Sequence, residues 1–157
     1  MTSSALSHDL VIVGAGTVGL ALAVALQNCG LRIAVVDARP RSAAQSDARV
    51  LALSWGSRQF LHRLGVWQAL SPAATAIETI HISQKGGWGQ TRMQAGEYQQ
   101  PALGYVASAG KLAKVLEDAL NPAQVDVFYE QNVSQIESRG CLVTLTTTQG
   151  LTLTAQL

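Results

Sequence analysis

The amino-acid sequence predicts an α/β fold that begins with a parallel sheet and ends with an antiparallel meander. The first observation is a strand–turn–helix–strand pattern over residues 10–37. The second is a series of short strands separated by glycine turns over residues 125–153. Between them, residues 77–108 alternate apolar and polar side chains, which predicts an antiparallel insert.

The composition limits the classes of protein to which the chain can belong. Its 157 residues are long enough for one domain with a core, and 48% hydrophobic against 13% charged residues exclude disorder. A net charge of +1 argues against nucleic acid as a partner and against a polybasic membrane patch. No signal peptide, spanning segment or C-x-x-C pair is present, so the cytoplasm is the expected location, with Cys29 and Cys141 as buried free thiols.

Residues 10–19 predict a nucleotide-binding turn. The apolar run Leu10–Val13 is typical of a strand buried in a parallel sheet, and Gly14-Ala15-Gly16-Thr17-Val18-Gly19 follows it in the G-x-G-x-x-G pattern. Gly14 permits the sharp exit from the strand, Gly16 lets the backbone approach a pyrophosphate, and Gly19 lets the helix lie close to the sheet. The helix then presents free N–H groups to that pyrophosphate.

The helix and the second strand complete this unit. Apolar residues recur at helical spacing from Thr17, Gly30 stands where a C′ glycine would end the helix, and Ile33–Val36 is the second strand. The expected apolar face comprises Val18, Ala21, Leu22, Ala25, Leu26 and Cys29. Asp37 ends the strand, where an acid can bind both ribose hydroxyls of an adenosine. The alternative is a βαβ unit without nucleotide, its glycines serving packing alone.

The segment after Asp37 offers two arginines of open role. Pro40 stops the strand, and Ser42–Asp47 is small and polar, which predicts a loop. Arg39 and Arg41 either reach a phosphate or are solvated loop charges. Arg49 precedes an apolar run, and composition alone favours an ordinary salt bridge, for instance with Asp47, over a contact with a cofactor.

A helix is expected after Ser54, which is a suitable N-cap, and Gly65 is a suitable C′ residue, with Val66 and Trp67 packing back under the last turn. In the insert, residues 77–83 and 91–93 flank a glycine turn, and residues 103–106 form a third strand. His81 is expected to face solvent. No metal site, activated nucleophile or carboxylate pair is evident.

The remaining elements follow from periodicity and turn residues. Lys111–Leu120 is a helix with Leu112, Val115, Leu116 and Ala119 on one face, and Val125–Tyr129 is a strand. Strands around residues 133–137, 142–146 and 151–153 form the meander. The first eight residues are polar and small, and we expect them to be disordered.

Together these residues resemble a known family. Gly14, Gly16, Gly19, Ala23, Leu26, Gly30 and Asp37 are similar to the extended FAD fingerprint of the group that contains glutathione reductase and the aromatic-ring hydroxylases. Asp47-x-Arg49 before Ala52-Leu53-Ser54, followed by Leu64-Gly65-Val66-Trp67, resembles the ubiquinone-biosynthesis hydroxylases, and residues 65–70, 74–77 and 102–104 resemble their 2-polyprenyl-6-methoxyphenol hydroxylase branch.

The resemblance implies an FAD-dependent monooxygenase with a three-layer, Rossmann-like FAD/NAD(P)-binding fold. NAD(P)H would reduce the FAD, which would then use oxygen to hydroxylate a prenylated phenol; the cofactor does this chemistry, so no catalytic side chain is assigned. It implies that the segment Gly14–Gly19 holds the pyrophosphate, that Asp37 with Ala38 and Arg39 lies at the ribose, that Arg49 lies along the FAD, and that the Val133 backbone touches the adenine. A prenylated substrate implies contact with the inner membrane surface or a biosynthetic complex, but no residue indicates this.

The resemblance also implies a division of the chain. Residues 1–76 would be the FAD-binding βαβ unit with its following helix, 77–108 a partial substrate domain, and 109–157 the return to the FAD domain. Ser108-Ala109 departs from the polar FAD contact usual in the family, and the later Asp-Gly and Gly-Asp motifs are not in this sequence, so we expect an N-terminal portion that is inactive alone. The alternatives are another FAD-dependent oxidase or dehydrogenase, or a non-catalytic NAD(P)- or FAD-binding Rossmann module.

Overall fold

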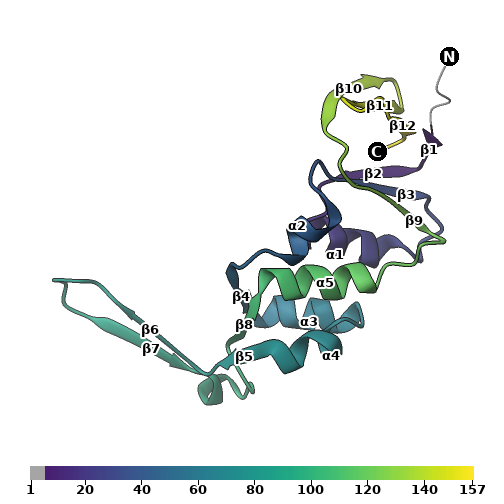
Figure 1. Cartoon of the computed structure of the whole chain (residues 1–157). Helices are drawn as coiled ribbons and strands as arrows, with labels where there is room; N and C mark the ends of the chain where they lie inside the picture. The colour runs from purple at the N-terminus through teal and green to yellow at the C-terminus, as the bar shows by residue number, and fades with distance from the viewer. Residues whose placement is uncertain (1–5) are drawn as a thin grey trace. The chain divides into compact units, whose positions relative to one another are not determined.

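A computed structural model of the chain describes residues 6–157 (Figure 1). Its contacts divide the chain into two compact units. The first comprises the chain up to Asp47 together with Ala113–Leu157, and the second is Ala48–Leu112. The expected division at residues 76 and 108 into a cofactor domain and a substrate-domain insert stays a prediction.

The first unit is built on a parallel sheet of three strands. Strands β2 (Leu10–Val13), β3 (Ile33–Val36) and β9 (Val125–Phe128) lie in the order β2-β3-β9, in register from Leu10↔Ile33 and Ile33↔Val125. Helix α1 (Thr17–Leu26) connects β2 to β3 and packs on the sheet through buried Leu20, Ala23 and Val24. The predicted strand–turn–helix–strand pattern is confirmed.

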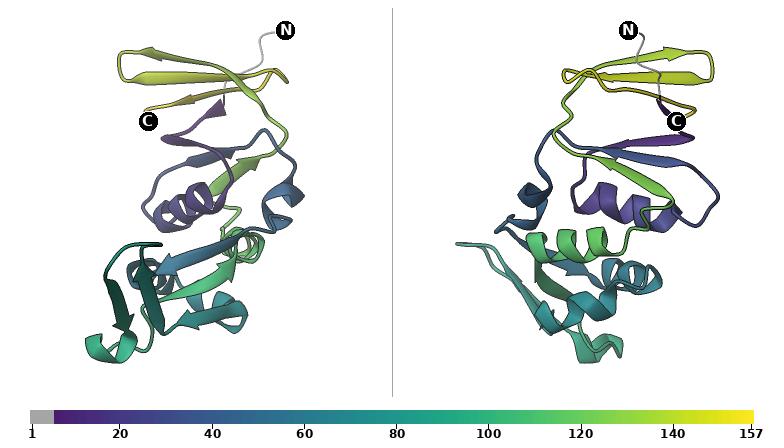
Figure 2. Two further views of the ribbon diagram at one scale, coloured as in Figure 1. Left: turned by 90° about the vertical axis from the view of Figure 1, so that its left-hand side faces the viewer. Right: turned by 45° about the vertical axis from the view of Figure 1, so that its right-hand side comes forward.

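A second sheet covers the other side of the parallel sheet (Figure 2). Strands β10 (Val133–Arg139), β11 (Leu142–Thr147) and β12 (Thr152–Ala155) form the predicted antiparallel meander, with left-handed Gly140 and Gly150 in its two turns. Leu145 and Leu153 of the meander form a buried cluster with Ala34 and Val36 of β3. Helix, parallel sheet and meander are therefore the three predicted layers.

The beginning of the described chain is ordered, contrary to expectation. Strand β1 (Leu6–Ser7) pairs in parallel with β12, so the order of the meander sheet is β1-β12-β11-β10. The expected disorder is wrong for these residues because their backbone groups bond to a strand almost 150 positions away, which no local pattern reveals. Residues 1–5 of the predicted leader lie outside the described residues.

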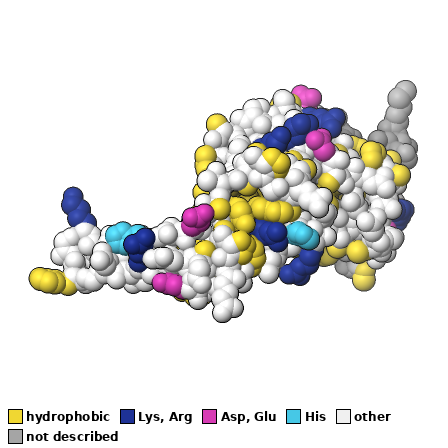
Figure 3. All heavy atoms as spheres, turned by 90° about the horizontal axis from the view of Figure 1, so that it is seen from below, with side chains coloured by type: hydrophobic (Ala, Val, Ile, Leu, Met, Phe, Trp, Pro, Cys, Tyr) yellow, Lys and Arg dark blue, Asp and Glu magenta, His cyan; other side chains and the backbone are white. Residues whose placement is uncertain are grey.

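The second unit contains a three-stranded antiparallel sheet and a hairpin. Strand β8 (Gly104–Ser108) lies between β4 (Val50–Ser54) and β5 (Ala74–Ile77). Among residues 6–157, strands β6 (Thr79–Ser83) and β7 (Gln90–Gln94) pair with each other and with no other strand, so the third predicted strand of the insert, β8, belongs to the other sheet. The hairpin extends as a narrow arm with hydrophobic side chains at its tip (Figure 3). His81 on this hairpin is exposed, as predicted.

Short helices connect these strands. Helix α3 (Trp55–Arg63) begins at Ser54, whose hydroxyl accepts a hydrogen bond from the N–H of Ser57. It ends in a Schellman motif, because the Gly65 N–H donates to His62 O and the Val66 N–H donates to Leu61 O. The predicted cap and stop are both confirmed. The other helical elements are α4 (Trp67–Leu70), η1 (Ser71–Ala73) and η2 (Ala95–Tyr98), and α5 (Ala109–Asp118) begins two residues before its predicted start.

The predicted apolar face of α1 is wrong. Val18 is 82% exposed and Leu22 is also exposed, whereas Leu20, Ala23 and Val24 are buried. Since α1 is apolar nearly all round, its periodicity does not determine which face is buried. The buried face is determined by Gly19, because a Cβ atom there would lie 1.9 Å from the carbonyl oxygen of Gly14. Only the side of the helix that carries this glycine can therefore contact the end of β2.

Three smaller expectations also fail. Helix α1 ends at Leu26, so left-handed Gly30 closes the turn beyond it rather than standing at C′. Residues 42–47 are not all loop, because Pro40 caps the short helix α2 (Arg41–Gln45), which tertiary contacts hold in place. Cys29 and Cys141 are free but exposed, since each lies in a turn that its apolar neighbours do not cover.

Among residues 6–157, none of the helices combines the length and the apolar character needed to cross a membrane.

The close contact at Gly19 predicts a stability difference between two glycine substitutions. We expect Gly19→Ala to lower the free energy of unfolding by about 1–3 kcal/mol, because the added Cβ overlaps a backbone oxygen that cannot move aside. Gly16→Ala adds a Cβ with no atom within 4 Å and is the matched control; it should cost only the preference of an N-cap for glycine over alanine, below about 1 kcal/mol. Urea unfolding followed by circular dichroism measures both, and equal losses would contradict this explanation.

Candidate cofactor site

A cavity of about 310 Å³ opens at the carboxyl ends of the parallel strands in the first unit. We call it the Asp37 cavity; it is lined by Val13, Gly14, Val36, Asp37, Ala38, Gln131, Asn132 and Val133. Ligands of open parallel sheets bind at this edge, because the connections diverge there and leave a crevice. The cavity lies wholly within the first unit.

Gly14 of the glycine turn lines the Asp37 cavity, and the turn leaves open space at Gly16. Gly14 adopts φ +109°, which favours glycine, and its N–H donates to the carbonyl oxygen of Val36. Gly16 is the N-cap of α1, no side chain caps this end, and a Cβ at Gly16 would meet no atom within 4 Å. Uncapped N–H groups beside open space suit a phosphate oxygen, so the turn fits the pyrophosphate of a dinucleotide.

Asp37 is buried and accepts hydrogen bonds at both carboxylate oxygens. Oδ2 accepts from the N–H of Ala15 at 2.7 Å, which joins the glycine turn to the end of β3. Oδ1 accepts from the backbone N–H of Arg39 at 2.8 Å, and the guanidinium of Arg39 donates to Oδ1 and Oδ2 at 3.1 Å each. All four acceptor positions of the carboxylate are therefore used.

These contacts keep Asp37 ionised. Burial by itself raises the pKa of this carboxyl, because it disfavours the charged form. The hydrogen bonds from the Arg39 side chain, the Arg39 N–H and the Ala15 N–H outweigh burial and hold the pKa below its ordinary value. For Asp37 to accept two ribose hydroxyls, the two bonds from the Arg39 guanidinium have to be exchanged for them.

The structure gathers most of the predicted site residues in one place. Gly14, Asp37, Ala38 and Val133 line the cavity, Ala15 and Arg39 bond to Asp37, and Gly16, Thr17, Val18 and Gly19 form the N-cap and first turn of α1. Arg49 belongs to the second unit, where its carbonyl oxygen accepts from the N–H of Ala109 at 2.9 Å. Its predicted contact with FAD stays a prediction, as do the ligand contacts of the other residues.

Four lining residues are not among the predicted site residues: Val13 and Val36, which end β2 and β3, and Gln131 and Asn132. Gln131 and Asn132 lie between β9 and β10, and the Gln131 N–H donates to the carbonyl oxygen of Asp37 at 3.0 Å. Nothing in their residue types marks a ligand site. The only signal available was their position directly after the third parallel strand, at the same sheet edge as Asp37.

Comparison with known proteins identifies the family. Residues 7–155 match the FAD-binding domain family. The chain belongs to this family. FAD is therefore its cofactor, as the sequence predicts, and the uncapped glycine turn and the open space at Gly16 fit the pyrophosphate of that cofactor.

Relatives of this FAD-binding domain come from several organisms. An uncharacterised protein of Synechocystis, slr1300, is 33% identical over 112 residues, which cover 71% of this chain and 27% of that protein. The ubiquinone hydroxylase UbiM of Neisseria meningitidis is 35% identical over 68 residues, 41% of this chain and 15% of UbiM. The chain thus spans less than a third of the length of these relatives.

Solved structures show the same fold. The p-nitrophenol 4-monooxygenase PnpA of Pseudomonas putida superposes with a TM-score of 0.79 at 20% identity, over 96% of this chain and 40% of PnpA. The flavin-dependent monooxygenase PieE, solved with FAD and substrate, gives a TM-score of 0.75 at 20% identity, over 96% of this chain and 29% of PieE. The predicted FAD-binding fold is confirmed.

The ionisation of Asp37 predicts a pH-dependent contribution to stability. Because the folded pKa is depressed, the contribution is complete above the unfolded pKa of about 3.9 and is lost as the pH falls through the folded pKa. We expect Asp37→Asn to lower the free energy of unfolding by about 1–3 kcal/mol at pH 7, because buried N–H donors lose a charged acceptor. Urea titrations from pH 7 to 3 measure the difference, which should shrink below about pH 4. A difference as large at pH 3 as at pH 7 would refute the assignment.

Proposed function

We propose that this chain is the FAD-binding portion of a monooxygenase that hydroxylates a prenylated phenol in ubiquinone biosynthesis, with NAD(P)H as the reductant. The observation that carries the FAD-binding part is the Asp37 cavity, which joins a glycine turn, a helix N-terminus and an ionised acid at one sheet edge. The ubiquinone part is supported by the similarity to UbiM and by the Asp47-to-Trp67 segment of the sequence.

In this proposal the Asp37 cavity and the glycine turn that borders it bind different parts of the cofactor. The N–H groups of Gly16, Thr17 and Val18 receive the pyrophosphate, where the helix dipole adds favourable charge. Asp37 accepts the ribose hydroxyls in place of the Arg39 guanidinium, and the backbone at Val133 lies against the adenine. Bound FAD supplies the redox chemistry that activates oxygen, so these residues bind and orient without moving protons.

The substrate also suggests where the protein works. A prenylated phenol partitions into lipid, so we propose that the protein acts at the surface of the inner membrane or within a biosynthetic complex, and otherwise resides in the cytoplasm. Flotation of the purified protein with vesicles of bacterial lipid tests the first part of this proposal. If the protein stays entirely in the aqueous fraction, binding to the membrane surface is refuted and the biosynthetic complex is the proposed location.

The cofactor part is tested by titrating the protein with FAD and following flavin fluorescence. We expect saturable binding, and in Gly16→Val an affinity at least about tenfold lower, because the new side chain fills the space that the pyrophosphate needs. Circular dichroism should show the variant folded, since no protein atom lies within 4 Å of the added Cβ. A folded protein that binds no FAD, or a variant that binds equally well, would contradict the proposal.

The substrate part is tested with the FAD-loaded full-length protein, NADH or NADPH, and a short-chain prenylated phenol. We expect oxidation of the reductant and a phenol product that has gained one oxygen atom, detected by mass spectrometry. The same phenol without its prenyl group is the control. Equal turnover of the two phenols, or oxidation of the reductant without a hydroxylated product, would overturn the assignment to a prenylated substrate.

A further inference from the structure

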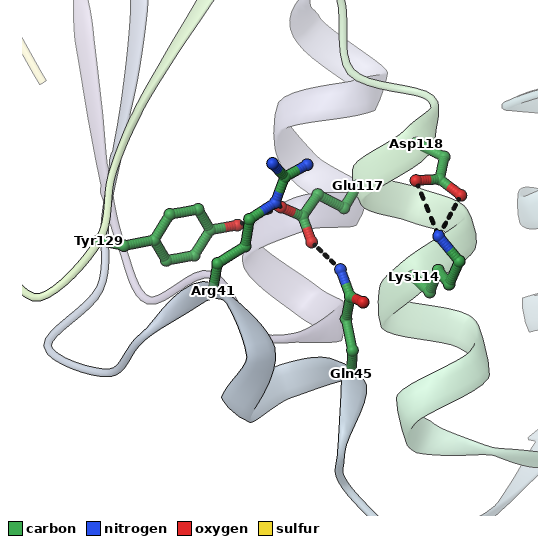
Figure 4. A network of polar contacts seen from close by, with 6 residues as sticks. All are labelled: Arg41, Gln45, Lys114, Glu117, Asp118 and Tyr129. Atoms are coloured by element: carbon green, nitrogen blue, oxygen red, sulfur yellow. Dashed lines mark hydrogen bonds and ion pairs between the residues drawn. The ribbon is translucent and has the colours of Figure 1, made fainter.

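A second buried carboxylate lies in the first unit, outside the Asp37 cavity. The Glu117 side chain on α5 is only 5% exposed and accepts three hydrogen bonds. Figure 4 shows Arg41, Gln45 and Tyr129 gathered around it. The donors are Arg41 Nε at 2.5 Å, Gln45 Nε2 at 2.7 Å and the Tyr129 hydroxyl at 2.7 Å. We call these four residues the Glu117 cluster. A buried carboxylate is costly unless several donors satisfy it, so a group with three donors holds its neighbours strongly in place.

The cluster ties helix α2 to α5. This helix has five residues and buries no side chain, and a single turn of that length is not stable by itself. Arg41 and Gln45 are four residues apart and project from the same side of the helix toward Glu117. Helix α2 begins immediately after Asp37–Pro40, so its position determines the path of the segment that leaves β3.

The same carboxylate fixes the segment that leaves β9. Tyr129 is the first residue after β9, and its hydroxyl donates to Glu117 Oε1. Burial, the bond to Glu117 and the Glu117 charge raise the pKa of this phenol, which therefore stays protonated and remains a donor. The next two residues bond across to the β3 exit, because the Glu130 N–H donates to Arg39 O at 3.2 Å and the Gln131 N–H to Asp37 O at 3.0 Å.

The segments that leave β3 and β9 lie side by side and both line the Asp37 cavity. Asp37 and Ala38 of the first segment line it, as do Gln131, Asn132 and Val133 of the second, whereas Glu117 and its three donors do not. Glu117 thus bonds to Arg41 and Tyr129, which adjoin the two lining segments, but Glu117 itself does not line the cavity. A change at Glu117 therefore reaches a ligand through these segments and not by direct contact.

We propose that Glu117 is a positioning residue that holds both segments lining the Asp37 cavity and thereby sets the affinity for the adenosine half of FAD. This inference rests on the proposed function, in which that cavity holds the adenosine. It assigns to α5 a role in cofactor binding that neither the glycine turn nor Asp37 supplies.

ADP is the probe, because it carries the adenosine and pyrophosphate of FAD without the flavin. In Glu117→Gln the charge that strengthens the bonds from Arg41, Gln45 and Tyr129 is lost, and an NH2 group replaces the oxygen that accepts from Gln45. Gln45 then has to turn its amide to keep a bond, so the cluster is weakened. We expect the dissociation constants of ADP and FAD, measured by calorimetry at 10 °C, to rise by a similar factor of about ten. Tyr129→Phe, which removes one donor, should raise both by a smaller factor.

Two control variants separate positioning from a general loss of stability. Asp118→Asn changes the neighbouring carboxylate on α5, which pairs at the surface with Lys114 at 3.1 Å, and should alter the dissociation constants by less than about twofold. Val24→Ala removes buried methyl groups from α1, two turns beyond the glycine turn, and should lower the unfolding temperature without weakening ADP binding at 10 °C.

The outcomes distinguish this inference from the proposed function. Wild-type protein that binds neither ADP nor FAD refutes the proposed function and this inference with it. Wild-type binding with Glu117→Gln within about twofold refutes the inference alone, as does a loss of binding in Val24→Ala equal to that in Glu117→Gln. If Glu117→Gln does not fold, Tyr129→Phe and Gln45→Ala decide, and unchanged ADP affinity in both refutes the inference.

Discussion

The first unit depends on the contact between the first turn of α1 and the end of β2. Gly19 lies so close to the Gly14 carbonyl that no side chain fits between them, and this contact sets the rotation of the helix. With the helix so placed, the Ala15 N–H faces the Asp37 carboxylate and joins the glycine turn to the neighbouring strand. The end of β2, the end of β3 and the N-terminus of α1 are then fixed together, and no atom lies within 4 Å of the position of a Cβ at Gly16.

Two buried carboxylates, Asp37 and Glu117, hold the segments that line the cavity. Asp37 lies inside it and is satisfied by Ala15 and Arg39, so the group that would bind a ribose also stabilises the unliganded protein. Glu117 lies outside it and orders both segments that line it. Since each carboxylate is buried with several donors, removal of either leaves unpaired donors, and cofactor binding and stability are linked in this unit.

The sequence predicts the local features of this structure and misses those that depend on distant contacts. Short stretches with strong conformational preferences predict four features: the glycine turn, the acid after β3, the Ser54 cap and the meander. The face of α1 was mispredicted because its residues are apolar nearly all round, and α2 because its partner Glu117 is 76 positions from Arg41. At the site, the sequence predicts Gly14, Asp37, Ala38 and Val133, whereas Gln131 and Asn132 lie at the cavity because of their position at a sheet edge, which residue type does not reveal.

The central claim is that the Asp37 cavity holds the adenosine half of FAD. The most direct measurement is the change in backbone amide resonances of the ¹⁵N-labelled protein as ADP is added. The account predicts the largest changes at Ala15, Gly16, Thr17, Ala38 and Val133, with smaller changes along the rest of the first unit. Changes that gather instead in residues 48–112, or around the separate cavity beside His8 and Arg32, would contradict the claim.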